Sequence, residues 1–114
     1  MTTLRVGWEA GRIRQLSVSG HAGFAPQGQD IVCAAASVLM TTCTNALESL
    51  AGIIPLVERR ERDAFMTLTL PDGIGGQAMK TAQIILRTGL QGFEDLSAAY
   101  PGHCRIIDGR KSSC

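Results

Sequence analysis

Residues 20–37 read GHAGFAPQGQDIVCAAAS and join a strand-like run to the first turns of a helix with periodic apolar residues. His21 lies on the strand side of the loop between them, and Cys33 lies on the helix side. Catalysis by a thiol needs a cysteine and a base that can take its proton, and histidine can serve as that base. The stretch therefore predicts a strand, a loop and a helix that bring these two side chains to one place.

The start of this helix bears on the reactivity of Cys33. Asp30 is a residue type preferred at N-caps, so we expect Ile31, Val32 and Cys33 to be the first three helical residues. Backbone N–H groups at these positions lack partners, and the positive end of the helix dipole favours a thiolate over a thiol. An alternative role for Asp30 is to orient His21, but a capping carboxylate is already occupied, so the cap is assigned first.

Helical periodicity separates a core face from a flank that carries Cys33. At about 100° per residue, the apolar residues of the core face form one stripe: Val32, Ala35, Ala36, Leu39, Cys43, Ala46, Leu47 and Leu50. Cys33 lies off this stripe, on the flank of Ser37 and Thr41, so we expect it to be reachable while Cys43 is buried. The alternative is that Cys33 only packs under the loop as a small apolar group.

The motif also resembles a known family. It is similar to the signature of the ribosomal-processing cysteine proteases, the Prp family, at Gly20, His21, Ala22, Gly28, Asp30, Ile31, Val32, Cys33, Ala34, Ala35 and Ser37. Chain length and the expected order of elements agree with the family over nearly the whole sequence. The resemblance implies a cysteine endopeptidase that removes the N-terminal extension of large-subunit ribosomal protein number twenty-seven. It also implies that His21 and Cys33 are the catalytic pair and that Gly20, Asp30 and Ser37 complete the site.

A mechanism and a substrate pocket follow from these placements. We expect His21 to take the thiol proton and the thiolate to attack the scissile carbonyl, with N–H groups at the helix start, including that of Cys33, as oxyanion donors. Ser37 could bond the thiolate or the loop; the alternative is a bond to its own i−4 carbonyl. The family's substrates carry aromatic residues just before the cut, which implies an apolar pocket with Phe24 and Met40 as candidate walls.

The chain before this motif predicts a hairpin. Leu4, Val6 and Trp8 alternate with polar residues, and a second strand follows in residues 13–18. Because Ile13 is out of phase with the rest of that strand, a bulge or a shifted register is expected near Arg14.

The chain after the first helix predicts a second hairpin in residues 53–70, a helix over residues 79–96 and a last strand in residues 103–108. The order ββαββαβ, with one apolar stripe on each helix, predicts an α/β (α+β) fold: a two-layer sandwich of a mixed sheet and two helices. Residues 1–108 are expected to form a single protease domain, and residues 109–114 a polar C-terminal tail.

The sheet face away from the helices needs cover in such a sandwich. Val6 or Trp8, Phe65 and Met66 are candidates to line it. A homodimer through this face or through an edge strand is therefore expected, and dimers are also what the family resemblance suggests.

Composition and charge indicate an ordinary soluble chain. It has 114 residues, 45% of them hydrophobic, and a formal net charge of +1, which gives no attraction to nucleic acid or membrane from charge alone. No apolar run is expected to reach membrane-spanning length, and residues 1–14 lack the features of a secretory signal. We therefore expect a cytoplasmic protein with no direct nucleic-acid or membrane partner.

The four cysteines are expected to stay reduced, because no export signal is recognised. A zinc site from His21, Cys33, His103 and Cys104 is conceivable, but no Cys-x-x-Cys or His-x3-His spacing supports it, so no metal or cofactor is expected. Two alternatives to a protease remain open. One is a thiol redox protein, which needs a resolving cysteine close to Cys33, and the other is a non-catalytic ribosome-associated binding module.

Overall fold

The computed structural model describes residues 1–20, 27–60 and 65–109, with the backbone alone for residues 27–30. Within these residues it contains five strands and two helices in the expected order ββαββαβ. Their bounds are β1 Thr2–Glu9, β2 Arg12–Ser19, α1 Gln27–Ala51, β3 Leu56–Arg60, β4 Phe65–Thr69, α2 Gly76–Ala99 and β5 Cys104–Asp108.

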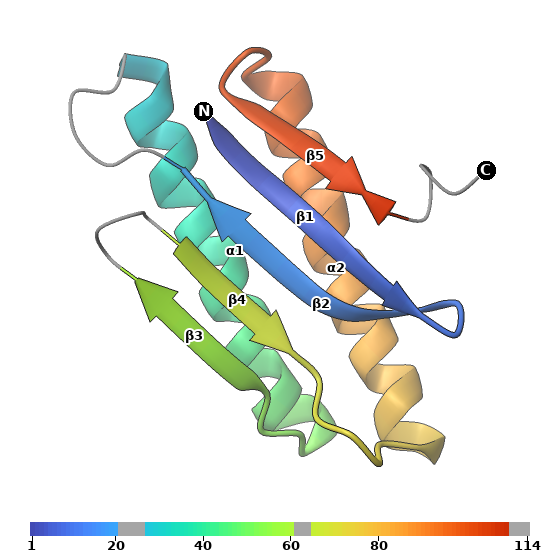
Figure 1. Ribbon diagram of the computed structural model, residues 1–114. Helices are drawn as coiled ribbons and strands as arrows, with labels where there is room; N and C mark the ends of the chain where they lie inside the picture. Colours follow the sequence, from blue (N-terminus) through green and yellow to red (C-terminus); the bar gives the residue numbers. More distant parts are fainter. Residues whose placement is uncertain (21–26, 61–64, 110–114) are drawn as a thin grey trace.

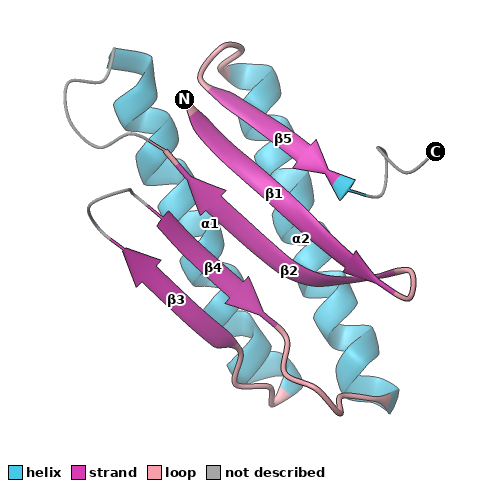
Figure 2. Ribbon diagram, viewed as in Figure 1, coloured by secondary structure: helices cyan, strands magenta, loops and turns pink. Residues whose placement is uncertain are grey.

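The strands form one mixed sheet in the order β3-β4-β2-β1-β5. β5 runs parallel to β1, and the other neighbouring strands are antiparallel. Both helices lie side by side on one face of the sheet (Figure 1, Figure 2). The two-layer α+β sandwich predicted from the sequence is therefore confirmed.

The core lies between the sheet and the helices. Alternate strand residues that face the helices, such as Leu4, Leu16 and Leu68, are almost fully buried. The buried stripe of α1 comprises Val32, Ala36, Met40, Cys43 and Leu47. The predicted stripe is wrong in two places. The observed stripe includes Met40, and it ends before Leu50, which lies in the last turn of α1 and is 71% exposed.

The irregularity expected near Arg14 is present in the β1–β2 hairpin. Gly7 pairs with Gln15 and Trp8 pairs with Ile13, so Arg14 is the extra residue of a β-bulge. The extra residue returns the side chain of Ile13 to the helix-facing side of the sheet. Ile13 is consequently fully buried, although it is out of phase in the sequence.

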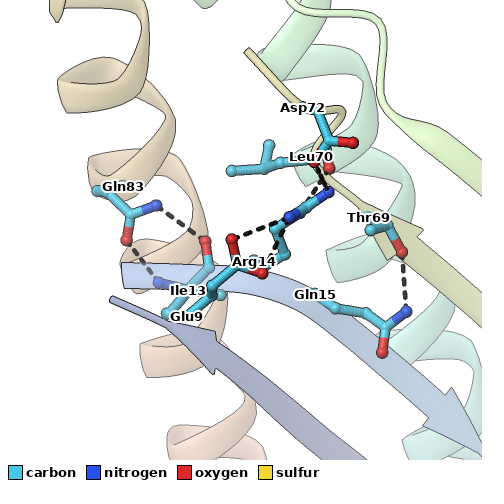
Figure 3. A network of polar contacts seen from close by, with 8 residues as sticks. All are labelled: Glu9, Ile13, Arg14, Gln15, Thr69, Leu70, Asp72 and Gln83. Carbon is cyan, nitrogen blue, oxygen red and sulfur yellow. Dashed lines mark hydrogen bonds and ion pairs between the residues drawn. The ribbon is translucent and has the colours of Figure 1, made fainter. Parts of the chain in front are cut away.

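Two side chains hold this bulge in place (Figure 3). Gln83 of α2 accepts a hydrogen bond from the N–H of Ile13 at 2.8 Å and donates one to the carbonyl of Ile13 at 2.9 Å. The Arg14 guanidinium forms ion pairs with Glu9 at 2.9 Å and with Asp72 at 2.6 Å. The hairpin is therefore anchored both to α2 and to the segment that follows β4.

The two helices approach each other closely at Gly89 and Gly92 of α2. A Cβ atom at Gly92 would lie 2.6 Å from Cδ2 of Leu39, and one at Gly89 would overlap Sγ of Cys43. Leu39 and Cys43 both belong to α1. Each glycine lowers helix propensity by about 1 kcal/mol relative to alanine, and here the missing side chains make room for the neighbouring helix.

The sheet face away from the helices is largely polar in the described residues. It carries Thr3, Gln15, Ser17, Thr67 and Thr69, which alternate with helix-facing neighbours.

Three of the four residues predicted to line this open face lie on the helix side instead. Val6 and Met66 are buried in the core, and the Arg87 guanidinium of α2 lies 5.4 Å from the centre of the Trp8 ring. Strand alternation is the reason for this placement, because every second side chain of a strand points toward the core. Phe65 is the first residue of β4 and lines a cleft together with residues of α1.

A segment of α1, Ile31–Ala51, has a mean hydropathy of 1.4 and is long enough to cross a membrane, contrary to our expectation. By length and composition, the core helix of a globular fold passes the same test. The apolar side chains Val32, Met40 and Leu47 are buried within the sandwich, so one face of α1 packs in the core, and 28% of the segment is buried.

Candidate active site

A cleft of about 190 Å³ lies between the N-terminal half of α1 and the adjoining ends of β1, β2, β3 and β4. Its lining includes Thr2, Val18, Ser19, Gly20, Cys33, Ala36, Ser37, Thr41, Arg59, Arg60, Phe65 and Met66. Gly20, Cys33 and Ser37 are site residues proposed from the sequence. The fold therefore brings these three residues to one surface feature.

Cys33 lies in the second turn of α1 and is half-buried. Its Sγ atom is 3.5 Å from Oγ1 of Thr2, the first residue of β1. The thiol lines the cleft instead of joining the buried stripe of α1. It is therefore placed on the flank that helical periodicity indicated.

The other two cysteines in the described part of the chain have a different environment. Cys43 and Cys104 are 5% and 4% exposed. Burial raises the pKa of the Cys43 thiol and of the Cys104 thiol, so both hold their protons at neutral pH. Since the thiolate is the nucleophile, neither of them competes with Cys33 as a reactive thiol.

The predicted N-cap at Asp30 is wrong. Helix α1 begins at Gln27, so Asp30 lies inside its first turn. In the i→i−4 pattern the N–H of Cys33 then bonds the carbonyl of Gln29, and it is no longer a candidate oxyanion donor. The sequence contained the competing signal in Pro26, which has no N–H to lose and suits a helix start.

Gly20 and Ser37 line the cleft from different elements. Gly20 follows the last residue of β2, and Ser37 is an exposed residue one turn after Cys33 on α1. Their supporting roles in the site remain a prediction from the resemblance.

His21 and Phe24, two further residues proposed from the sequence, lie outside the described residues. Gly20, directly before His21 in the chain, lines the cleft. Among residues 1–20, 27–60 and 65–109, no group of three or more His, Cys, Asp or Glu side chains could hold a metal ion.

Met40 does not form a wall of the cleft. It shares the flank of Cys33 on a helical projection, yet its side chain is fully buried in the core. The sheet packs against α1 at Met40, so Met40 is part of the core. Cys33 lies two turns earlier in α1, at the edge of the core.

Sequence reasoning missed the walls that the strands supply. Val18, Phe65 and Met66 provide apolar surface, and Arg59 and Arg60 provide positive charge. The Arg60 guanidinium lies 4.2 Å from the centre of the Phe65 ring, a cation–π contact. The alternation of apolar residues in the sequence could identify the apolar face of β4. It could not show that this face lies next to the N-terminal half of α1.

Comparison with protein families gives a match over residues 1–105 to the family described as cysteine protease Prp. The chain is 29% identical to the ribosomal processing cysteine protease Prp of Bacillus subtilis (strain 168) over 104 residues. That alignment covers 91% of this chain and 92% of the relative.

Solved structures share the fold. The Streptococcus mutans protein SMU.848 is 28% identical with a TM-score of 0.83, and the alignment covers 95% of this chain and 93% of that one. Staphylococcus aureus Prp with a covalently linked product peptide is 25% identical with a TM-score of 0.78, over 95% and 99% of the two chains. The S. aureus enzyme with a substrate peptide has a TM-score of 0.83 at 24% identity, again over 95% and 99%. With a half-buried thiol in a cleft and a family match over almost its whole length, this chain belongs to the Prp family of cysteine proteases.

Proposed function

We propose that this protease removes the N-terminal extension of large-subunit ribosomal protein number twenty-seven, with Cys33 as nucleophile and His21 as general base. The observation that carries the proposal is the position of Cys33, half-buried and lining a cleft together with Gly20, which precedes His21 in the chain. The B. subtilis relative is named a ribosomal processing protease, and S. aureus Prp was solved with a substrate peptide. These names support ribosomal protein processing and a peptide substrate, and the choice of protein number twenty-seven comes from the motif resemblance.

The proposed reaction has two stages. His21 accepts the proton of Cys33, and the thiolate attacks the scissile carbonyl carbon. The imidazolium then protonates the leaving amine as the peptide bond breaks, which leaves a thioester on Cys33. Water, deprotonated by His21, hydrolyses the thioester, releases the extension with a new carboxylate and restores the thiol.

Asp30 is the candidate for orienting His21. Its carboxylate is not the N-cap of α1, because α1 begins at Gln27. Ser37 is exposed in the cleft one turn after Cys33, so its hydroxyl is free to contact a bound peptide.

The apolar pocket for aromatic residues before the cut is proposed to form from Phe24 together with Val18, Phe65 and Met66. The last three line the cleft near Cys33. Their apolar surface is suited to an aromatic side chain of a peptide.

A redox function has less support. A reversible disulfide at Cys33 requires a resolving thiol within bonding reach. Among the described residues, the other cysteines are Cys43 and Cys104, which are buried and do not line the cleft. Cys114 lies outside the described residues. A protease needs only the one thiol.

We also propose that residues 1–108 act as a single protease domain in the cytoplasm and that the protein is a homodimer. Support for a dimer comes from the sheet edge, where Ile54, Leu56 and Val57 are 73%, 61% and 41% exposed. An exposed apolar edge strand is a common site of pairing between copies. Light scattering at micromolar concentration tests this, and a monomer mass contradicts it.

The substrate assignment is tested with a synthetic peptide that spans the extension junction of the protein's own ribosomal substrate. Mass spectrometry should show one cut with the wild type and none with Cys33→Ala or His21→Ala. Cys43→Ala is the matched control, because it removes a thiol from the same helix but outside the cleft. Cleavage by Cys33→Ala would refute the assignment of the nucleophile.

A further inference from the structure

Thr2 is an unusual neighbour for a reactive thiol, because its side chain is polar and only 2% exposed. Its backbone is fixed in the sheet: the N–H of Thr2 donates to the carbonyl of His103 at 3.0 Å, and Thr2 pairs with Cys104 of β5. Thr2 also alternates with Thr3 and so shares the helix-facing side with Leu4. The hydroxyl is therefore held at the N-terminal end of β1, directly beside α1.

The hydroxyl of Thr2 contacts the atom on which the proposed chemistry depends. Oγ1 of Thr2 and Sγ of Cys33 are 3.5 Å apart. A hydroxyl can donate to a thiolate or accept from a thiol, and the charge-assisted bond to the thiolate is the stronger of the two. The contact therefore holds the sulfur of Cys33 beside the first residue of β1.

Gly20 leaves the space that this contact requires. A Cβ atom at Gly20 would lie 3.3 Å from Oγ1 of Thr2 and 3.5 Å from its Cα. The glycines with positive φ in the described residues do not include Gly20, so the need for glycine here is one of space and not of backbone conformation. The role that the family resemblance gave to Gly20 thereby gains a physical explanation.

We propose that Thr2 is a positioning residue of this protease: its hydroxyl donates a hydrogen bond to the Cys33 thiolate, and Gly20 keeps that hydroxyl in place. The proposal rests on the proposed role of Cys33 as nucleophile. Among the described residues, Arg59 and Arg60 of β3 line the same cleft. The titratable residue His103 and the N-terminal residue Met1 are neighbours of Thr2. Asp30 and His21 are near Cys33 in sequence, and their side chains lie outside the described part of the structure.

The test compares Thr2→Val, which keeps the shape and removes the hydroxyl, with Thr2→Ser, which keeps the hydroxyl. Thr3→Val is the matched control, because Thr3 is also buried, at 6% exposure, but points to the other face of β1. Its hydroxyl accepts a hydrogen bond from Arg105 and not from the Cys33 side. The readout is the rate of Cys33 alkylation by iodoacetamide from pH 5 to 10, resolved by peptide mass spectrometry. Cleavage of the junction peptide is followed in parallel.

Thr2→Val should lower alkylation of Cys33 and kcat/KM at neutral pH by about tenfold and move the alkylation profile to higher pH. Thr2→Ser should stay within about threefold of the wild type, since it keeps the donor, and Thr3→Val should match the wild type. Should Thr2→Val fail to fold, Gly20→Ala serves as the second variant and should shift the profile in the same direction.

A wild-type profile for folded Thr2→Val, or for Gly20→Ala where Thr2→Val does not fold, overturns the inference about Thr2. This outcome is separate from failure of the proposed function. If Cys33→Ala still cleaves the peptide, the nucleophile is wrong. If Cys33→Ala is inactive while Thr2→Val behaves as the wild type, only the inference about Thr2 is wrong.

Discussion

The Sγ atom of Cys33 and the Oγ1 atom of Thr2 lie 3.5 Å apart, although 31 positions separate these residues in the chain. The contact joins the second turn of α1 to the first residue of β1. The position of the Cys33 thiol therefore depends on the sheet as well as on its own helix. Substitutions that weaken strand pairing at Thr2 should therefore change the position of the Cys33 thiol, even though no residue of α1 is altered.

The cysteines should differ in reactivity in the folded protein. Cys33 lines the cleft, whereas burial raises the pKa of Cys43 and of Cys104. Iodoacetamide at pH 7.5, followed by peptide mass spectrometry, should modify Cys33 at least about tenfold faster than either buried thiol, since the thiolate is the reacting form. Denaturation in urea should abolish the difference. Equal rates in the folded protein would contradict the placement of Cys33.

Stability should fall at alkaline pH because of the two buried thiols. Both have pKa values raised by burial, so each binds its proton more tightly in the folded chain than in the unfolded chain. Their stabilising effect is complete below about pH 8.5, the ordinary cysteine pKa, and is lost as the pH rises through the folded value. The melting temperature should therefore drop between pH 8 and 10. In a Cys43→Ala/Cys104→Ala variant the drop should be smaller, and an unchanged slope would count against this origin.

Gln83 should contribute to stability through the β-bulge. Replacing it with Leu removes both bonds to the backbone of Ile13 and should lower the free energy of unfolding in urea by about 1–3 kcal/mol. Gln83→Glu keeps an acceptor for the N–H but places a carboxylate oxygen against the carbonyl of Ile13, so it should also lower stability. The control is Gln91→Leu on the exposed face of α2, where a change within about 0.5 kcal/mol is expected. A neutral Gln83→Leu would show that the bulge does not need this anchor.

The contact of Gly89 with Cys43 should appear as a coupling between the two helices. Gly89→Ala gains about 1 kcal/mol of helix propensity but forces a Cβ atom into Sγ of Cys43. Overpacking of this kind costs about 1–3 kcal/mol, so the single variant should be less stable in urea. Adding Cys43→Ala removes the overlap, and the double variant should lose less than the sum of the two single losses. Additive losses would show that the helices have room at this crossing.

The sequence contains enough information for the fold because its signals are periodic. Alternating apolar residues indicate strands, and the stripes of α1 and α2 indicate helices that cover one sheet face. Even the bulge at Arg14 was detectable, since Ile13 was out of phase. The start of α1 was missed because the capping preference of Asp30 is a local signal that the surrounding structure overrides.

The site was only partly predictable, since it depends on contacts between distant segments. Gly20, Cys33 and Ser37 could be predicted to lie together because they belong to one continuous motif, and all three line the cleft. Thr2 and the walls from β3 and β4 enter the cleft through strand order, which no local pattern encodes. Met40 was misassigned for the same reason. A helical projection shows on which flank of the helix a residue lies, but it does not show whether the sheet covers that residue.

The central claim, that the thiol of Cys33 attacks the scissile carbonyl, is tested most directly by a covalent trap. A peptide that ends at the residue before the cut and carries a C-terminal chloromethyl ketone alkylates the nucleophile that faces that position. After digestion, mass spectrometry should place the adduct on Cys33, and excess junction peptide should slow its formation. An adduct on another residue, or full cleavage activity in protein whose Cys33 is completely alkylated, would contradict the claim.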